Sequence, residues 1–283
     1  MTADKSGRSK VTAAKRRRFA TMISVLLIVA GVTGLAVCFG VYRSRQAVYE
    51  FARDEYSRLQ PQQMAASTVA PDEGAQEAQT TAAQADGQSA DANHPFQNVD
   101  IAALREMNPD CIGWIEIPGT EISYPVVIGS DNEYYVEYTF MKTQNKAGAI
   151  FADFRCSGDF SDFHTIVYGH NMRDGSMFAQ LKDYCDAAFL QEYSVIYLHR
   201  QGEVLVYRVL MARQTSYDDW IYTLTAGADE ESVLREELAK ALKMTDGLHE
   251  SGRFLTLSTC TGGIDRDARV IVSAVLEEVL SVR

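Results

Sequence analysis

The sequence is poor in the residue patterns that bind metal ions or that stabilise small domains through disulfide bonds. Among 283 residues there are five cysteines and five histidines. No two cysteines form a CxxC pair, and no histidine spacing is typical of a zinc site. The cysteines, an odd number without a compelling disulfide pair, are Cys38, Cys111, Cys156, Cys185 and Cys260. We therefore expect no metal and no organic cofactor.

The chain also lacks a net positive charge. Its formal net charge is −11 at pH 7, and because the N-terminal tail is basic, most of the negative charge belongs to the remainder. Proteins bind nucleic acid largely through Lys and Arg contacts to phosphates, so an acidic domain argues against a nucleic-acid partner. No internal repeat is present.

One long apolar segment lies near the N-terminus. Residues 19–42 contain no charged side chain and are long enough to cross a bilayer as a helix. Basic residues cluster before this segment, and acidic residues follow it closely. The positive-inside rule therefore predicts a cytoplasmic basic tail over residues 1–18 and a single-pass signal anchor over residues 19–42. A cleaved signal peptide, for which no Ala-x-Ala site is evident, and a lipid anchor at Cys38 are the alternatives.

The chain after the anchor divides into a helix, a spacer and a folded domain, all expected outside the cell. Residues 44–60 carry apolar side chains at near-helical spacing, which predicts a helix that extends the membrane helix or docks on the domain. Residues 61–95 are rich in Ala, Gln, Thr, Asp, Glu and Ser and bury too little to fold. We therefore predict a helix and flexible spacer over residues 43–95 and one domain over residues 96–283.

Many short strands with a few helices between them are predicted in the domain. The strands are expected at 112–117, 122–128, 147–151, 165–168, 195–198, 204–212, 254–260 and 269–276. The helices are expected at 99–107, 177–184 and 229–245. This order favours a mainly β fold with some α, a barrel or a sandwich, over a doubly wound sheet.

The strand at 254–260 ends in the residue with the most evident chemistry. Leucines alternate with Thr256, Ser258 and Cys260, which predicts one apolar face and one polar surface that ends in a thiol. The next strand is expected to pair antiparallel with it and to bring Arg269 near that thiol. A nearby cation favours the thiolate, which is the nucleophilic form. The alternative is a small buried cysteine beside a surface arginine.

A nucleophilic cysteine usually works with a histidine that transfers a proton. His170 follows an apolar strand and a glycine, where a side chain can be held over a sheet edge, and we favour it over His199. His164 and His199 lie at strand ends and are expected in solvent. His94 falls in the spacer, and His249 falls in a loop close to the cysteine in sequence.

Together these residues resemble the sortase family, the cysteine transpeptidases that attach exported proteins to the cell wall of Gram-positive bacteria. The matching motifs are Thr256-Leu-Ser-Thr-Cys260, Arg269 on the next strand and Tyr168-Gly-His170. Details that resemble class B are Asp131-Asn132 before Tyr134-Tyr135, Gly148-Ala-Ile-Phe-Ala-Asp153 and His170-Asn-Met-Arg-Asp-Gly-Ser-Met177. The resemblance implies an eight-stranded β-barrel with N-terminal helices and a further helix before the strand of the cysteine.

The resemblance also implies roles for individual residues. By this likeness Cys260 is the nucleophile, His170 the general acid and base, and Arg269 the group that holds the scissile carbonyl or its oxyanion. Class B members often carry an acidic residue after the cysteine; here Thr261 stands there, and its backbone N–H is a further candidate oxyanion donor. Candidate substrate-binding residues are Ser258, Thr259 and Tyr217; the alternatives are an ordinary strand serine for Ser258 and a packing role for Tyr217.

The function implied by the resemblance is a membrane-anchored thiol transpeptidase. Such an enzyme cleaves the C-terminal sorting motif of an exported protein and forms a thioester at its cysteine. The acyl group then passes to an amine, from a peptidoglycan precursor or from the lysine of a pilin. A pilin-polymerising sortase, a cell-wall cysteine peptidase or amidase, and an inactive anchored binding module are the alternatives.

Overall fold

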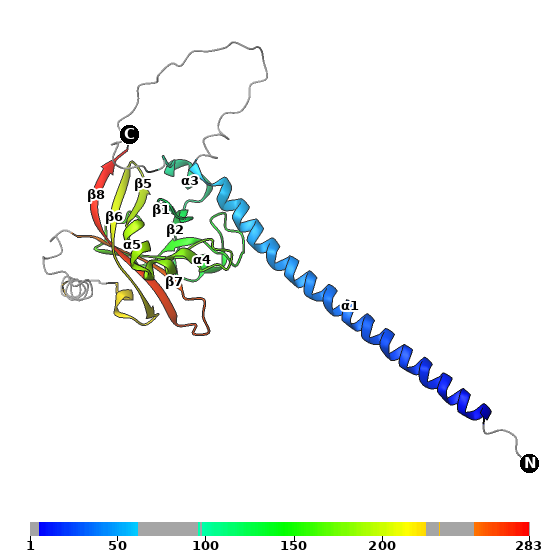
Figure 1. The fold of residues 1–283 in the computed structure, drawn as a ribbon. Helices are drawn as coiled ribbons and strands as arrows, with labels where there is room; N and C mark the ends of the chain where they lie inside the picture. The colour runs from blue at the N-terminus through cyan, green and yellow to red at the C-terminus, as the bar shows by residue number, and fades with distance from the viewer. Residues whose placement is uncertain (1–5, 62–95, 97, 225–231, 233–251, 283) are drawn as a thin grey trace, which may run out of the picture. The chain divides into compact units, whose positions relative to one another are not determined.

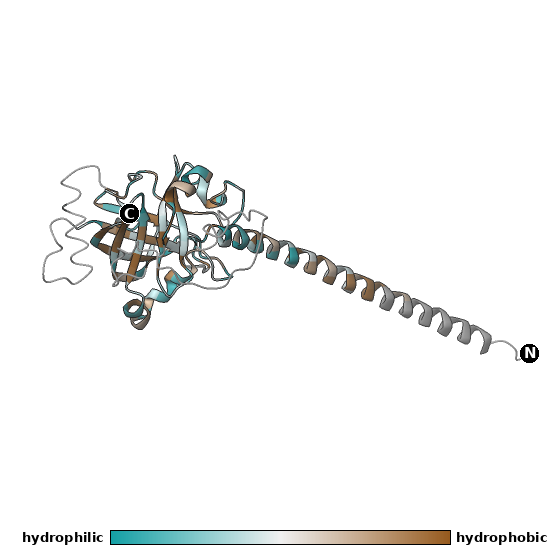
Figure 2. Cartoon of the chain, turned by 90° about the horizontal axis from the view of Figure 1, so that it is seen from above, coloured by the Kyte–Doolittle hydropathy of each residue, from teal (hydrophilic) through white to brown (hydrophobic). Residues whose placement is uncertain are grey.

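The computed structural model describes residues 6–61, 96, 98–224, 232 and 252–282. The chain forms two compact units, residues 1–50 and residues 51–283. Helix α1, Ser6–Arg58, forms the described part of the first unit, and its last turns, from residue 51 on, belong to the second unit. Among the described residues, one helical stretch, Leu26–Arg58, is long and apolar enough to cross a membrane by length and composition. Figure 2 shows the apolar part of α1 in brown.

The end of α1 is part of the folded domain. Ala52, Tyr56 and Leu59 are buried in its hydrophobic core. The Tyr56 hydroxyl donates a hydrogen bond of 2.7 Å to the carbonyl oxygen of Gly148. The sequence left open whether this segment continues the preceding helix or docks on the domain, and the structure shows that it does both. Nearly all of the predicted spacer, residues 62–95, lies outside the described residues.

The domain is a closed barrel of eight strands, as the sequence resemblance implied (Figure 1). Its neighbouring strands follow the order β1, β2, β3, β4, β7, β8, β6, β5. The strands are β1 Cys111–Glu116, β2 Ser123–Ile128, β3 Ile150–Ala152, β4 His164–Tyr168, β5 Val195–Arg200, β6 Glu203–Ser216, β7 Phe254–Cys260 and β8 Ala268–Ser281. Two of the neighbouring pairs, β2 with β3 and β4 with β7, are parallel, and the others are antiparallel.

The helices differ more from the sequence predictions than the strands do. Helix α3, Ile101–Met107, confirms the predicted helix, and Asp100 caps its N-terminus with a side chain that accepts from the backbone N–H of Ala103. The helix expected at 177–184 is instead the 3₁₀ helix η1, Ala179–Cys185. Met177 has a φ of 57°, a left-handed conformation that a right-handed helix cannot include.

Three short helical elements were not predicted: α4 Tyr134–Glu137, α5 Ala187–Glu192 and η2 Trp220–Tyr222. The helix predicted at 229–245, the expected helix before the strand of the cysteine, lies outside the described residues, apart from residue 232.

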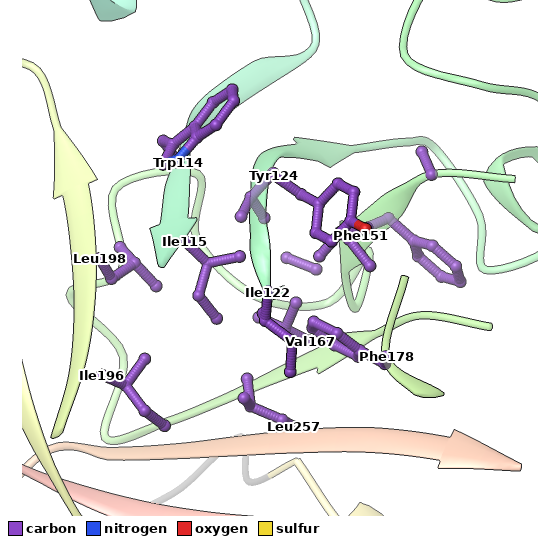
Figure 3. Packing of buried hydrophobic residues seen from close by; sticks show 14 of the residues in the cluster. Trp114, Ile115, Ile122, Tyr124, Phe151, Val167, Phe178, Ile196, Leu198 and Leu257 are labelled. Carbon is purple, nitrogen blue, oxygen red and sulfur yellow. The ribbon is translucent and has the colours of Figure 1, made fainter. Parts of the chain in front are cut away.

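Strand β7 is buried on both faces, whereas the sequence predicted one polar surface. Leu255 and Leu257 are fully buried in the main core, where burial of a leucine contributes about 1.5–3 kcal/mol. Figure 3 shows Leu257 near Val167 of β4. On the opposite face Thr256 and Ser258 are also buried, and a second apolar cluster forms there around Phe254, Ile221 and Ile271. Cys260 is the exposed residue of the strand.

Candidate active site

The parallel pairing of β4 with β7 brings the candidate histidine beside the candidate cysteine. Tyr168 lies opposite Ser258, so both strands end at the same edge of the barrel wall. The backbone N–H of Gly169 donates to the carbonyl oxygen of Ser258 at 3.1 Å and extends this pairing by one residue. His170 is the next residue on one chain segment, and Cys260 lies two residues beyond Ser258 on the other.

The candidate arginine reaches the same edge through β8. Cys260 and Arg269 are direct cross-strand partners in the antiparallel β7–β8 pair, so their side chains leave the same face of the sheet. One terminal nitrogen of Arg269, Nη1, donates to the carbonyl oxygens of Arg266 and Ala268, at 2.6 and 3.1 Å. These bonds hold the guanidinium by one end, and its remaining N–H groups, which have no hydrogen-bond partner among the described residues, can face a ligand.

The three candidate catalytic residues line one pocket. The pocket has a volume of about 400 Å³, and Cys260, His170 and Arg269 contribute to its wall. Aromatic side chains on the same wall come from Phe151, Tyr168, Tyr217 and Tyr222. Its lining includes two arginines and no Asp or Glu among the residues that the structure describes.

The histidine is oriented by a backbone carbonyl that the sequence analysis did not identify. His170 Nε2 lies 2.8 Å from the carbonyl oxygen of Val136, just before the end of α4. A carbonyl oxygen only accepts, so Nε2 carries the hydrogen, and Nδ1 is the nitrogen left for proton transfer. The next residue, Asn171, donates from Nδ2 to the carbonyl oxygen of Cys260 at 2.9 Å, which ties the histidine loop to the cysteine.

A family model described as the sortase domain matches residues 115–277. The chain belongs to the sortase family. It is 35% identical to sortase B of Listeria monocytogenes over 170 residues, which cover 57% of this chain and 67% of that protein. It is also 30% identical to sortase B of Staphylococcus aureus over 173 residues, 60% of this chain and 71% of that protein.

Solved structures agree with this assignment. The crystal structure of Clostridium perfringens sortase B matches with a TM-score of 0.55 at 30% identity, over 62% of this chain and 99% of that one. A sortase B–substrate complex from Staphylococcus aureus matches with a TM-score of 0.56 at 27% identity, over 63% and 84% of the two chains. These relatives place the sortase in class B, so it is a cysteine transpeptidase.

The candidate substrate-binding residues of this sortase occupy three different environments. The Ser258 hydroxyl is buried and lies 2.8 Å from the hydroxyl of Tyr222, a residue that the sequence analysis did not identify. Thr259 is buried on the opposite face of the strand, and its hydroxyl has no hydrogen-bond partner among the described residues. Tyr217, 58% exposed, also contributes to the wall. All three line the pocket of Cys260.

The electrostatics of Tyr222 reflect its position between strand β7 and the arginine. Burial raises the pKa of its hydroxyl, and the hydrogen bond with Ser258 and the positive charge of Arg269 oppose that rise. The phenol therefore stays neutral near pH 7 and can both donate and accept a hydrogen bond in the pocket.

The backbone N–H of Thr261 is not available as an oxyanion donor, which corrects a suggestion of the sequence analysis. It donates to the carbonyl oxygen of Ala268 at 3.2 Å and continues the β7–β8 pairing past Cys260. Among the groups that the sequence suggested for this task, the guanidinium of Arg269 is the one with N–H donors that stay unpaired within the described part of the chain.

Two other histidines of the sortase are buried, although the sequence analysis expected them in solvent. Burial lowers the pKa of His164 to about 4, and its Nε2 lies 2.9 Å from the hydroxyl of Thr256. His199 is also buried, with its Nε2 3.8 Å from a carboxylate oxygen of Glu116. Neither lines the pocket of Cys260. His94 and His249 lie outside the described residues.

All five cysteines are free thiols. Burial raises the pKa of Cys111 to about 11 and that of Cys156 to about 12, so both remain protonated near neutral pH. Cys260 is thus free to react. Within the described part of the chain, no group of three or more His, Cys, Asp or Glu side chains is arranged to hold a metal ion.

Proposed function

We propose that this class B sortase attaches exported proteins to the cell wall through a thioester at Cys260. The observation that carries the proposal is the convergence of Cys260, His170 and Arg269, from three distant segments, on one pocket at the barrel edge. The substrate is a protein with a short C-terminal sorting motif, and the acceptor is an amine of a peptidoglycan precursor.

The reaction has two halves. In the first, the thiolate of Cys260 attacks a carbonyl carbon of the motif, forms a C–S bond and places negative charge on the carbonyl oxygen. Arg269 stabilises this oxyanion, and protonated His170 gives its proton to the departing amine as the oxyanion collapses and the C–N bond breaks. In the second half, the acceptor amine attacks the thioester, His170 takes its proton, and the sulfur leaves as thiolate.

The N-terminal part of the chain suits an enzyme that works at a membrane surface. We propose that residues 1–18 are cytoplasmic, that residues 19–42 anchor the chain, and that residues 43–95 and the catalytic domain lie outside the cell. The apolar stretch of α1 and the basic residues before it support this orientation. A membrane-impermeant maleimide applied to intact cells should label exposed thiols such as Cys185; absence of labelling in cells that contain the protein would refute the orientation.

The experiment that tests the function detects the covalent intermediate. Full-length chain in detergent is mixed with sorting-motif peptides, and the mass of the protein is measured before and after an amine is added. We expect an adduct that disappears on addition of the amine and that does not form in the Cys260→Ala variant. An adduct that persists in Cys260→Ala, or wild-type protein that forms none with any motif peptide, would refute the proposal.

A second test concerns the oxyanion donor. Arg269→Lys keeps the positive charge but loses the planar guanidinium, so we expect turnover to fall by about 100-fold or more while the fold is retained. Arg208→Lys is the matched control, because Arg208 lies on β6, pairs with Glu277 at 3.0 Å and is not part of the pocket. Near-normal turnover in Arg269→Lys would remove this residue from the mechanism.

A pilin-polymerising enzyme differs only in the acceptor amine, so a comparison of lysine-containing pilin peptides with peptidoglycan-like amines separates the two activities. A cysteine peptidase or amidase usually carries its cysteine at the start of a helix. Here Cys260 ends strand β7 and is followed by β8, which favours the transpeptidase. If the protein is instead an inactive binding module, Cys260 should react with iodoacetamide no faster than an ordinary free thiol.

A further inference from the structure

A fully buried carboxylate lies behind the wall of the active-site pocket. Asp153 follows strand β3, and its side chain is 0% exposed. It accepts hydrogen bonds from Asn132 Nδ2 at 2.9 Å and from the Tyr168 hydroxyl at 3.0 Å. It also accepts from Arg155, whose Nε and Nη2 each lie 2.8 Å from one of its oxygens. A buried charge is tolerated only when it is paired and hydrogen-bonded in this way.

This arrangement fixes the guanidinium of Arg155 in one orientation. The edge formed by Nε and Nη2 faces Asp153, and Nη2 also lies 3.4 Å from the carbonyl oxygen of Tyr222. The remaining terminal nitrogen, Nη1, has no hydrogen-bond partner among the residues that the structure describes. The side chain is 44% exposed and lines the same pocket as Cys260. A preorganised donor is therefore present in the pocket at no further entropic cost.

The charge of Arg155 decides which acceptor suits this donor. Asp153 neutralises the guanidinium, so the pair presents hydrogen-bond donors to the pocket without a net positive charge. A ligand carboxylate would lose its hydration without gaining an unpaired cation, whereas a neutral carbonyl oxygen gives up much less hydration. The pair therefore suits an amide carbonyl.

We propose that Arg155 is a substrate-binding residue whose free edge donates a hydrogen bond to an uncharged carbonyl oxygen, of the backbone or of an amide side chain, in the sorting-motif peptide. This inference rests on the proposed function, because it requires that the peptide lies in the pocket of Cys260. The alternative is that Arg155 serves only to neutralise Asp153 and makes no contact with substrate.

The variant that separates these two roles is Arg155→Lys. A lysine can pair with Asp153 and so preserve the buried carboxylate, but one ammonium group cannot also present the second planar edge to the substrate. Arg208→Lys is again the control: Arg208 is 44% exposed like Arg155, it pairs with a carboxylate, and it lies away from the pocket. Full-length proteins in detergent are compared, with motif peptides as donors and hydroxylamine as the acceptor.

We expect Arg155→Lys to raise KM for the peptide about tenfold or more, since the hydrogen bond from the free edge of the guanidinium to the substrate is lost. The value of kcat, the melting temperature and the rate of Cys260 alkylation by iodoacetamide should stay close to those of wild type. Arg208→Lys should leave KM unchanged. A purely structural role predicts the opposite: either no change at all, or parallel losses in melting temperature, kcat and alkylation.

A double variant distinguishes the loss of a substrate contact from misfolding caused by an unpaired buried charge. Asp153→Asn with Arg155→Met removes the buried charge together with its partner, and Asp153→Asn alone keeps the arginine. Because Asp153 orients Arg155, KM should rise by less in Asp153→Asn than in the double variant, provided that both melt like wild type; if both rise equally, the inference is wrong.

Peptide chemistry provides the second arm of the test. Matched peptides that differ by Gln against Glu at each motif position show which acceptor Arg155 prefers. A wild-type preference for a Glu peptide that is lost in Arg155→Lys would overturn the assignment of an uncharged carbonyl. If the wild-type protein turns over the peptide and Arg155→Lys has the same KM, only the role of Arg155 is refuted. If the wild-type protein forms no adduct, the proposed function and this inference are refuted together.

Discussion

Acidification from neutral pH should destabilise this sortase through His164. The ring is buried, its Nε2 lies 2.9 Å from the Thr256 hydroxyl, and that hydroxyl lies 3.1 Å from the one of Ser273. Its other nitrogen, Nδ1, has no partner among the described residues. Burial therefore disfavours the charged imidazolium and lowers the pKa from 6.5 to about 4.

The sign of the effect follows from proton linkage. Above pH 6.5 the histidine is neutral in both folded and unfolded chains, so its full contribution to stability is present. Between pH 6.5 and about 4 the unfolded chain takes up a proton that the folded chain refuses, and stability falls. At about 1.4 kcal/mol for each pH unit, this loss approaches roughly 3 kcal/mol at the lower end of the window.

The loss can be measured by urea denaturation across this pH window, with fluorescence of Trp114, which is fully buried in β1, as the reporter. His164→Gln keeps a side-chain amide near Thr256 but does not titrate, so the pH dependence in this window should flatten. The carboxyl of Asp153, whose pKa is held below its usual value by the hydrogen bonds of Arg155 against the effect of burial, contributes only at lower pH. An equal loss of stability in His164→Gln and wild type would refute the reasoning.

Two further predictions concern the histidine loop. Gly169→Ala places a methyl group 2.4 Å from a side-chain carbon of Ile150 and 2.7 Å from one of Phe178, so we expect a loss of about 1–3 kcal/mol in stability and lower turnover; an unchanged melting temperature would contradict it. Asn171→Ala removes the 2.9 Å bond to the carbonyl oxygen of Cys260, so adduct formation should slow about tenfold with little change in melting temperature. Wild-type rates of adduct formation would show that this bond does not position the cysteine.

Much of the barrel and of the candidate site could be predicted from local patterns. The alternation around Leu255 and Leu257 identified a strand with one apolar face, and the core contains both residues. A glycine after an apolar strand marked His170 as a residue at a sheet edge, and the structure places it beside the end of β7. Such features depend on a few neighbouring residues, which is why the sequence reveals them.

The rest depended on contacts between distant segments, which periodicity does not encode. The polar face of β7 is buried because Thr256 contacts His164 and Ser258 contacts Tyr222, and neither partner is close in sequence. The same holds for the carbonyl of Val136 that orients the histidine. Only spatial proximity identifies such partners.

The parallel pairing of β4 with β7 also means that strand register, more than the loops between strands, places the sulfur of Cys260 beside the imidazole of His170. The sequence that joins β4 to β7 contributes two further strands, β5 and β6, to the same barrel. Evolution, or an engineer, can therefore vary the loops between these strands more freely than the strands themselves. A shift of either strand by a single residue is not tolerated in the same way, because it would turn the thiol toward the opposite side of the wall.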